Sequence, residues 1–498
     1  MLAGGAHPAL SIDERLVSLG STPIDQMCCV FKVHHRLRQI NVAAYEPDLL
    51  AIGPYHHGKD HLSFMEKHKL RFLQRMLKRR DENSAERYIT AMIEKEETAR
   101  RFYADQFPEL SKEKFVEMML LDGCFIIELF RIHRDAIFHV LELDQISQSV
   151  ENEPIFQTNW MINGIMRDLL LFENQLPFFI LTELFEMSEG CNQQYDYVRE
   201  RVPTRLLDRA LAFFCLTLEL SCELKVNGSS YVSDANIKHL LGLIHKAMSP
   251  LPKVKKSQRG MKFEETHKSK DLVGPNENED WMSVPYATDL QDVGAKIEQA
   301  MKFKDRLFGE LKKEEWKPIP NVIELQEAGV KFNKAETGNL FHIKFNNGIM
   351  EIPPLNILDN TESVFRNLIA YEQHSQQSNL NYVTDFATLM DYLINTPKDV
   401  ELLRRNGIIN SWMGDDEVVS NMFNKICCYT HFSRDFYYAD IIKQVNKHCH
   451  RRWNVRMAKL RRDYFNSPWA LLSVLAAILL LLLAIAQTVF SILSYVFN

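Results

Sequence analysis

An uninterrupted apolar run near the C-terminus is the feature that most constrains this chain. Residues 469–490 read WALLSVLAAILLLLLAIAQTVF, and from Trp469 to Ala486 the only polar residue is Ser473. A helix of about 20 such residues, rising about 1.5 Å per residue, crosses a hydrocarbon core of about 30 Å. We therefore predict a transmembrane helix over residues 468–490, and the alternative is an all-apolar core helix. The predicted membrane anchor includes Trp469, Leu471, Leu480, Ile485 and Phe490.

The charges on the two sides of this run are unequal. No Lys or Arg follows it before Asn498, whereas residues 451–467 hold six cations and a single acid, Asp463. The positive-inside rule places the N-terminal body in the cytosol, as in a single-pass, tail-anchored protein. The predicted basic stem consists of Arg451, Arg452, Arg456, Lys459, Arg461 and Arg462. These cations also suit anionic lipid, although a topology signal alone is an equally good interpretation.

Composition limits the remaining function classes. The net charge of −6 and the pI near 6.3 give no global signature of a nucleic-acid-binding protein. The first residues, MLAGGAHPALSIDERL, lack the basic and apolar regions of a signal peptide. Nine cysteines in 498 residues indicate reduced thiols rather than a disulfide framework. The partners expected from sequence are a lipid bilayer and an unidentified protein, with no nucleic acid and no cofactor.

Helical periodicity dominates the body. Residues 65–80 place Leu70, Leu73, Met76 and Leu77 on one face, and residues 86–102 form a charged amphipathic stretch. Residues 114–130 and 160–185 predict central core helices, the second split or kinked at Pro177. Further helical patterns cover residues 205–220, 237–248, 362–376 and 385–393, and the chain from about residue 416 to the stem. The predicted fold class is mainly α.

A small β element interrupts the helices. Residues 340–345 and 349–352 alternate apolar and polar side chains around Asn346, Asn347 and Gly348, which predicts a hairpin. The stretches beginning at residues 284 and 319 resemble each other, each reading as a Pro-led short helix that ends at a glycine before an extended segment. The predicted organisation is a variable tail (1–24), a helical N-terminal part (25–248), a flexible linker (249–281), a small α+β element (282–355), a helical C-terminal part (356–450), the stem (451–467), the transmembrane helix (468–490) and a short tail (491–498).

The loop from Gly53 to Lys59 matches G-x-x-x-x-G-K, the pattern of a phosphate-binding loop. However, Asp60 stands where a Ser or Thr hydroxyl should bind Mg²⁺, and Pro54 removes a backbone donor. No alternating strand–helix pattern follows to build a parallel sheet. A structural Gly-Pro turn is therefore the favoured interpretation, and nucleotide binding is the alternative.

Two groups of side chains are candidates for metal or thiol chemistry. The histidines gather near Cys28 and Cys29 but show none of the standard zinc spacings, which favours ordinary hydrogen-bonding roles. They are His34, His35, His56, His57, His61 and His68. No base can be assigned to Cys427, Cys428 or Cys449 from one sequence, and inert core thiols are favoured, with Cys449 also near enough to the stem for palmitoylation.

Carboxylates occur inside apolar helices at Asp122, Glu128 and Glu173. A buried carboxylate must be paired or protonated. The polar triplet from Glu173 to Gln175 precedes Pro177, so we predict that it caps the broken helix or satisfies the freed backbone groups. General acid–base catalysis would need a second partner that the sequence does not identify.

Several stretches together resemble a plant-specific family known as domain of unknown function 247. They include AIGPYHHGK (51–59), MLLDGCFIIELF (119–130), DLLLFENQLPFF (168–179), IKFNNGIMEIPP (343–354) and FRNLIAYEQ (365–373). This chain departs from the family at His34 and His35, where Pro-Glu is common. The resemblance implies the helical body and the C-terminal helix, and it implies no established activity or catalytic residues.

The expected function follows from these points. The resemblance associates some grass relatives with the pollen side of self-incompatibility, which implies protein–protein recognition for those branches. We expect a non-enzymatic interaction or signalling module displayed on a membrane. The alternative is a hydrolase or nucleotide-binding enzyme that uses the loop from Gly53 to Lys59.

Overall fold

The computed structural model describes residues 28–142, 154–189, 205–218, 237–250, 318–336, 339–374, 381–430, 436–450 and 468–496. The chain forms two compact units, residues 1–250 with 318–498 and residues 251–317, and all described residues belong to the first. The predicted flexible linker beyond residue 250, the N-terminal tail and the first copy of the internal repeat therefore lie outside the described residues. The predicted domain boundaries remain predictions.

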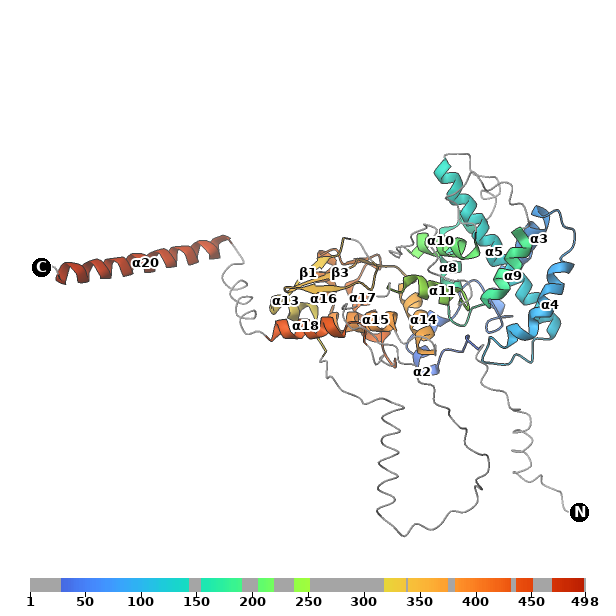
Figure 1. The fold of residues 1–498 in the computed structure, drawn as a ribbon, viewed down its shortest axis with the longest axis horizontal. Helices are drawn as coiled ribbons and strands as arrows, with labels where there is room; N and C mark the ends of the chain where they lie inside the picture. Colours follow the sequence, from blue (N-terminus) through green and yellow to red (C-terminus); the bar gives the residue numbers. More distant parts are fainter. Residues whose placement is uncertain are drawn as a thin grey trace, which may run out of the picture. The chain divides into compact units, whose positions relative to one another are not determined.

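The N-terminal part is built around the 31-residue helix α5 (Lys112–Glu142). Helices α3 (Ser63–Arg79), α4 (Glu86–Arg100), α9 (Phe178–Glu189) and α10 (Leu206–Leu218) pack against it (Figure 1). Apolar side chains of α5 such as Phe115, Phe125 and Phe130 are fully buried, because this helix is apolar on more than one face. The remaining elements here are α2 (His35–Arg38), η1 (Val42–Tyr45), η2 (Asp60–Leu62), α7 (Pro154–Gln157), α8 (Asn159–Leu169) and α11 (Leu240–Met248).

The limits of two core helices follow from local residues. Ser111 precedes α5 and its Oγ accepts the N–H of Lys114 at 3.4 Å. The pattern over residues 160–185 is divided into α8, which ends at Leu169, and α9, which begins at Phe178, so the predicted split at Pro177 is confirmed. The predicted face of α3 is partly wrong: Leu73 and Met76 are buried, but Leu70 is exposed.

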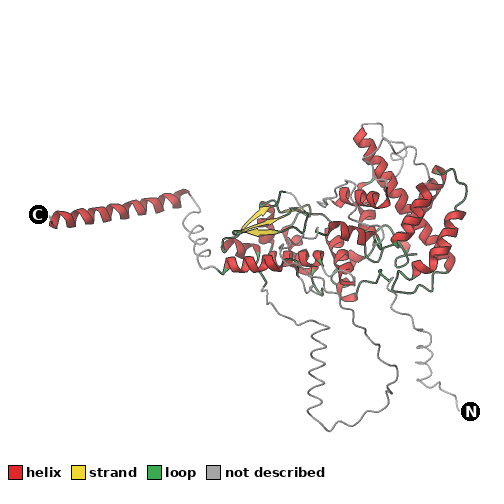
Figure 2. Cartoon of the chain, in the orientation of Figure 1, coloured by secondary structure: helices red, strands yellow, loops and turns green. Residues whose placement is uncertain are grey.

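Strands gather in one small region of an otherwise helical body (Figure 2). β3 (Ile349–Ile352) lies between β1 (Lys331–Lys334), to which it is parallel, and β2 (Lys344–Asn346), to which it is antiparallel. β4 (Leu355–Ile357) pairs with β5 (Ile409–Ser411) in a second, parallel sheet. The fold class of mainly α with a small sheet is thus confirmed.

The predicted hairpin is present with a shorter first strand. Asn347 and Gly348 have φ of 50° and 80°, the conformation of a type I′ turn. Residues 340–343 form a turn instead of a strand, because Asn339 accepts the N–H groups of Phe341 and His342. The second repeat copy also matches its prediction, with α13 (Val322–Glu327) ending near Gly329 before β1.

The C-terminal part contains α14 (Thr361–His374), α15 (Tyr382–Leu393), α16 (Pro397–Arg405), α17 (Asp416–Ile426) and α18 (Ala439–Cys449). The helical pattern predicted from residue 416 to the stem is two helices, and Tyr429 lies between them with a φ of 63°. α14 packs against η1, α11, α15 and α17, so it joins the two parts of the body.

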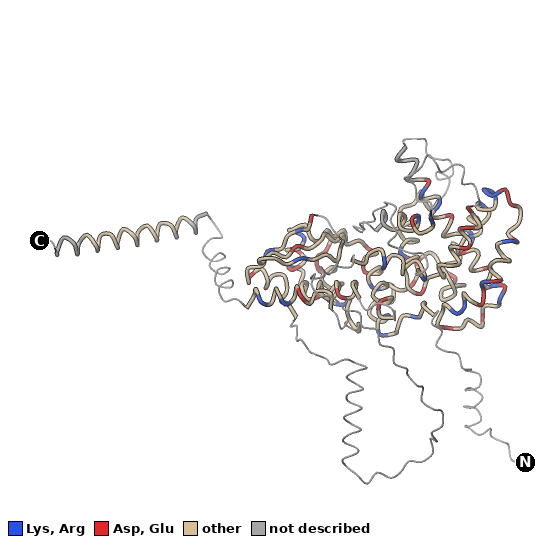
Figure 3. The backbone as a smooth tube through the Cα atoms, viewed as in Figure 1, with Lys and Arg blue, Asp and Glu red and all other residues tan. Residues whose placement is uncertain are grey.

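Residues Pro468–Val496 form a single helix, α20. Its described part carries no charged side chain (Figure 3), and Leu480, Ile485 and Phe490 are exposed by 67%, 53% and 72%. No helix among the described residues is both long enough and apolar enough to cross a membrane. The prediction of a transmembrane helix over 468–490 is therefore not supported.

Two of the predicted anchor residues and the whole predicted stem lie outside the described side chains. The side chains of Trp469 and Leu471 lie outside the described residues, although both positions belong to α20. The whole basic stem also lies outside them, including Arg451, Arg452, Arg456, Lys459, Arg461 and Arg462.

Candidate functional site

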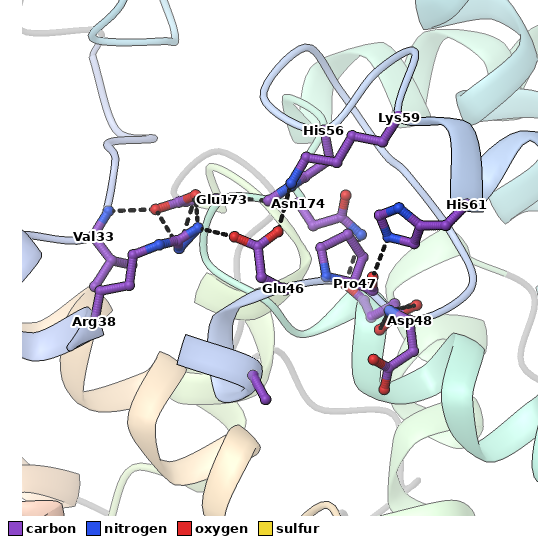
Figure 4. A network of polar contacts seen from close by, with 12 residues as sticks. Val33, Arg38, Glu46, Pro47, Asp48, His56, Lys59, His61, Glu173 and Asn174 are labelled. Atoms are coloured by element: carbon purple, nitrogen blue, oxygen red, sulfur yellow. Dashed lines mark hydrogen bonds and ion pairs between the residues drawn. The ribbon is translucent and has the colours of Figure 1, made fainter. Parts of the chain in front are cut away.

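The loop of residues 46–59 and the segment of residues 168–175 meet in one polar network (Figure 4). Asp168, at the end of α8, receives the backbone N–H groups of Asp48, Leu49 and Leu50 at 2.7–3.1 Å. Burial raises the pKa of Asp168 to about 6, although these hydrogen bonds favour its charged form. The Asp168 side chain therefore joins the end of α8 to a loop that lies more than 100 residues earlier in the sequence.

The two amides that follow Glu173 satisfy backbone groups where α8 ends. The amide of Asn174 accepts the N–H of Ile52 at 2.6 Å and donates to the carbonyl oxygens of Leu50 and Asp168. Gln175 donates to the carbonyl oxygens at 169 and 171 and accepts the N–H at 241. The predicted structural role of the polar triplet is confirmed, because unpaired buried carbonyls are costly.

Ion pairs connect Glu173 to the loop. One oxygen of Glu173 accepts the N–H of Val33 at 2.6 Å, and the other lies 3.3 Å from the guanidinium of Arg38. Arg38 also pairs with Glu46 at 2.5 Å, and Glu46 pairs with Lys59 at 2.5 Å (Figure 4). Burial raises the pKa of Glu173, and Arg38 opposes that rise. The alternating charges make the network internally compensated.

Two of the groups that a phosphate-binding loop would use are already bonded inside the protein. The N–H of Gly53 donates to Asp122 at 2.8 Å, and Lys59 Nζ lies 2.9 Å from His56 Nδ1 as well as pairing with Glu46. Burial lowers the pKa of His56 to about 3, so its neutral ring accepts from the ammonium of Lys59. The loop leads into η2, and the described residues before it, 46–52, form no strand. The arrangement is that of a packed turn.

The predicted buried carboxylates of α5 are paired. Asp122 lies 2.6 Å from the buried ammonium of Lys69, and burial raises the pKa of this carboxyl while Lys69 opposes it. Glu128 pairs with Arg79 at 2.7 Å and with Arg131 at 2.9 Å. These contacts fasten α3 to α5, and they use the charges that acid–base chemistry would need.

The histidines have separate structural roles. His34 Nδ1 accepts the N–H of Arg36 at 3.4 Å, His61 Nε2 lies 3.3 Å from the carbonyl oxygen of Pro47, and His68 packs against Phe64. Over the described ranges, no group of three or more His, Cys, Asp or Glu side chains is arranged to hold a metal ion. A zinc site at this cluster is thus not supported.

Four of the described thiols lie in environments that make them poor nucleophiles. Burial raises the pKa of Cys29 and of Cys427 to about 12, and it also raises the pKa of Cys124 and Cys449. A thiolate is the reactive form, so these environments favour inert cysteines.

Sequence reasoning assigned no role to several residues that hold the site. Asn367, buried in α14, accepts the N–H of Phe172 and donates to the carbonyl oxygens of Ala44 and Ser363, each at 2.8 Å. In the same way Glu372 accepts from His245 and from the N–H groups at 383 and 384. The sequence signal for Asn367 and Glu372 was a polar residue within an apolar run, as for Asp168. The partners of these residues lie too far away in sequence to be inferred.

Comparison with known proteins shows the family to which this chain belongs. A family model described as plant protein of unknown function, domain of unknown function 247, matches residues 30–483. The chain belongs to this family. The match covers the polar network and most of α20, so the resemblance seen in the separate motifs is confirmed over nearly the whole chain.

Two relatives from Arabidopsis thaliana are similar along their length. The UPF0481 protein At3g47200 is 27% identical over 479 residues, covering 94% of this chain and 87% of the relative. The putative UPF0481 protein At3g02645 is 25% identical over 498 residues, covering 92% and 89%. No solved structure matches the chain.

Proposed function

We propose that this member of the domain of unknown function 247 family is a non-enzymatic module for protein–protein recognition or signalling, held at a lipid bilayer through α20. The observation that carries the proposal is the exposed apolar surface of α20. Exposed apolar side chains on this scale are unfavourable in water and are typical of a surface that meets lipid or another protein.

The sequence around α20 supports lipid as that environment. Trp469 begins the apolar run, and the basic stem of six cations directly precedes it. Aromatic residues favour the headgroup region, and cations favour the cytosolic leaflet. We therefore place the helical body on the cytosolic side. This is also the arrangement in which the body is presented to cytosolic partners.

The non-enzymatic part of the proposal rests on how the body uses its reactive groups. Asp122, Asp168 and Glu173 each hold backbone N–H groups or cations within the fold. Such contacts stabilise loops, and they engage these three carboxylates within the fold. Recognition of another protein is also what the family resemblance implies for some grass relatives in self-incompatibility.

The alternative is an enzyme that binds a nucleotide at the loop from Gly53 to Lys59. The bonds from Lys59 to Glu46 and His56 weigh against it, because phosphate would have to replace them. Calorimetric titration of the full chain with ATP and GTP separates the two functions. We expect no binding, and nucleotide binding that Lys59→Ala abolishes would favour the enzyme.

Membrane attachment is tested with the full chain expressed in plant cells. We expect it to stay with the membrane fraction after an alkaline wash, and the double variant Leu480→Arg with Ile485→Arg to be released, because each buried arginine costs about 2.5–3.5 kcal/mol in a bilayer. The matched control is Ile93→Arg on α4, also an exposed isoleucine, which should remain attached. Recovery of the unmodified chain in the soluble fraction would exclude the proposed attachment.

A further inference from the structure

Helix α3 is strongly basic in a chain whose net charge is −6. Between Ser63 and Arg79 it carries six Lys or Arg residues and a single acid, Glu66. Two of these cations are used inside the fold, since Lys69 pairs with Asp122 and Arg79 pairs with Glu128. A basic excess therefore remains on the side of α3 that faces solvent.

Three of the remaining cations form one stripe. Lys67, Arg71 and Lys78 are exposed, and no described residue forms an ion pair with any of them. Their spacing of four and seven residues places them on one face of the helix. Uncompensated charges in a row raise the local potential and attract an anionic surface.

Two large apolar side chains lie beside this stripe. Phe64 is 58% exposed and precedes Lys67 by three residues, and Leu70 is 60% exposed between Lys67 and Arg71. A helix face that is only solvated gains no stability from exposed Phe and Leu side chains. The combination of cations with Phe and Leu is the pattern of a helix that lies in a membrane interface.

The opposite side of α3 fixes the stripe in place. Met65, Phe72 and Met76 are buried, and α3 packs against α5. The stripe therefore requires no folding upon binding, which lowers the entropic cost of contact.

We propose that the exposed face of α3, formed by Phe64, Lys67, Leu70, Arg71 and Lys78, is a docking surface for anionic lipid. The cations pair with acidic headgroups while Phe64 and Leu70 enter the interface. The surface is separate from α20, and its evidence does not depend on membrane attachment there. If α20 also holds the protein at a bilayer, the second contact becomes intramolecular and needs little intrinsic affinity.

Lysine footprinting of the full chain tests this surface directly. The chain is mixed with vesicles of phosphatidylcholine alone, or with about one third phosphatidylserine, and acetylated briefly with a reactive ester before peptide mass spectrometry. We expect Lys67 and Lys78 to lose reactivity about fivefold or more only with phosphatidylserine, and to regain it in about 0.5 M NaCl. Lys398 on α16 and Lys112 at the start of α5 are exposed internal controls that should change less than about twofold.

Variants separate charge from apolar contact. In Lys67→Glu with Arg71→Glu, Lys78 should react with phosphatidylserine vesicles as fast as it does with phosphatidylcholine. In Phe64→Ser with Leu70→Ser, protection should weaken while remaining sensitive to salt. All four positions are exposed, and an unchanged circular dichroism spectrum and melting temperature would establish that the fold is kept.

The outcomes distinguish this inference from attachment through α20. Equal protection of Lys67 and Lys78 in both vesicles, or equal protection of Lys398, overturns the docking surface while leaving α20 attachment intact. Binding only to phosphatidylserine vesicles, with protection of the stripe, supports the docking surface and argues against α20 as the anchor. Binding to neither vesicle overturns both.

Discussion

Asp168 shows how single polar residues hold this body together. Its carboxylate is buried at the end of α8 and receives three consecutive backbone N–H groups of a distant loop. The sequence places an acid beside an apolar run, which indicates that some partner must exist. It does not identify that partner, because the side chain closes a contact across 118 residues. By contrast, the local part of the roles of Asn174 and Gln175 could be predicted, since the carbonyl oxygens of Asp168, Leu169 and Leu171 lie within six residues of them.

His239 gives a residue-scale prediction about pH. It begins α11, where its Nδ1 accepts the N–H of Gly242 at 3.1 Å, and burial lowers its pKa to about 3. An unfolded histidine has a pKa of about 6.5, so below that pH only the unfolded chain binds this proton and the free energy of unfolding falls as the pH decreases. His239→Asn keeps a capping oxygen and removes the titration. Between pH 6 and pH 4 the wild type should therefore lose about 1.4 kcal/mol more per pH unit than the variant in urea denaturation.

A second substitution at His239 provides the control. His239→Leu also removes the titration but loses the cap, so it should show the same shallow pH dependence with a free energy of unfolding lower by about 1 kcal/mol at every pH. Equal pH dependence of His239→Asn and the wild type would contradict the assignment.

At the scale of elements, local signals in the sequence worked where the structure is local. The break before Pro177 and the turn at Asn347 and Gly348 both appear as predicted. Pairing between distant segments did not follow from sequence: the β4–β5 ladder joins residues more than 50 apart, and its strands contain only three residues each. The exposed Leu70 is another case that the sequence did not predict, because apolar periodicity defines a helix face but does not show which neighbouring element covers it.

The hairpin turn supports a prediction at this scale. A Cβ at Gly348 would lie 2.6 Å from His448 Cε1 and 3.0 Å from His448 Nε2, in addition to the cost of a positive φ. Gly348→Ala should therefore lower the free energy of unfolding by more than about 2 kcal/mol. Gly414→Ala is the matched control, because Gly414 has a similar φ of +77° with open space around it, and it should cost about 1 kcal/mol. Equal losses in urea denaturation would show that the contact with His448 does not matter.

At the scale of the whole body, α14 connects the N-terminal and C-terminal parts. Asn367 bonds to Phe172 and Ala44, and Ser363 also donates to the carbonyl oxygen of Ala44 at 2.7 Å. These contacts are buried, so breaking them leaves backbone groups without partners. We infer that the two parts unfold together.

Asn367→Asp tests this cooperativity with almost no change in shape. The carboxylate still accepts from Phe172 but faces the carbonyl oxygens of Ala44 and Ser363, so the variant should lose about 2–4 kcal/mol of stability. Hydrogen exchange should speed up near residues 44 and 172 together with α14. Asn406→Asp is the control, because the exposed side chain of Asn406 donates to the carbonyl oxygen of Leu402, only four residues away. This substitution should lower the free energy of unfolding by less than about 0.5 kcal/mol. Faster exchange confined to α14 would indicate independent parts.

The long reach of Asn367 also sets an order of events during synthesis. Ala44 and Asn367 are separated by 323 residues. At roughly 5–20 residues per second, a ribosome needs tens of seconds to produce the second after the first. During that interval the carbonyl oxygen of Ala44 lacks its bond to Asn367, and a chaperone that covers the nascent N-terminal part would protect it.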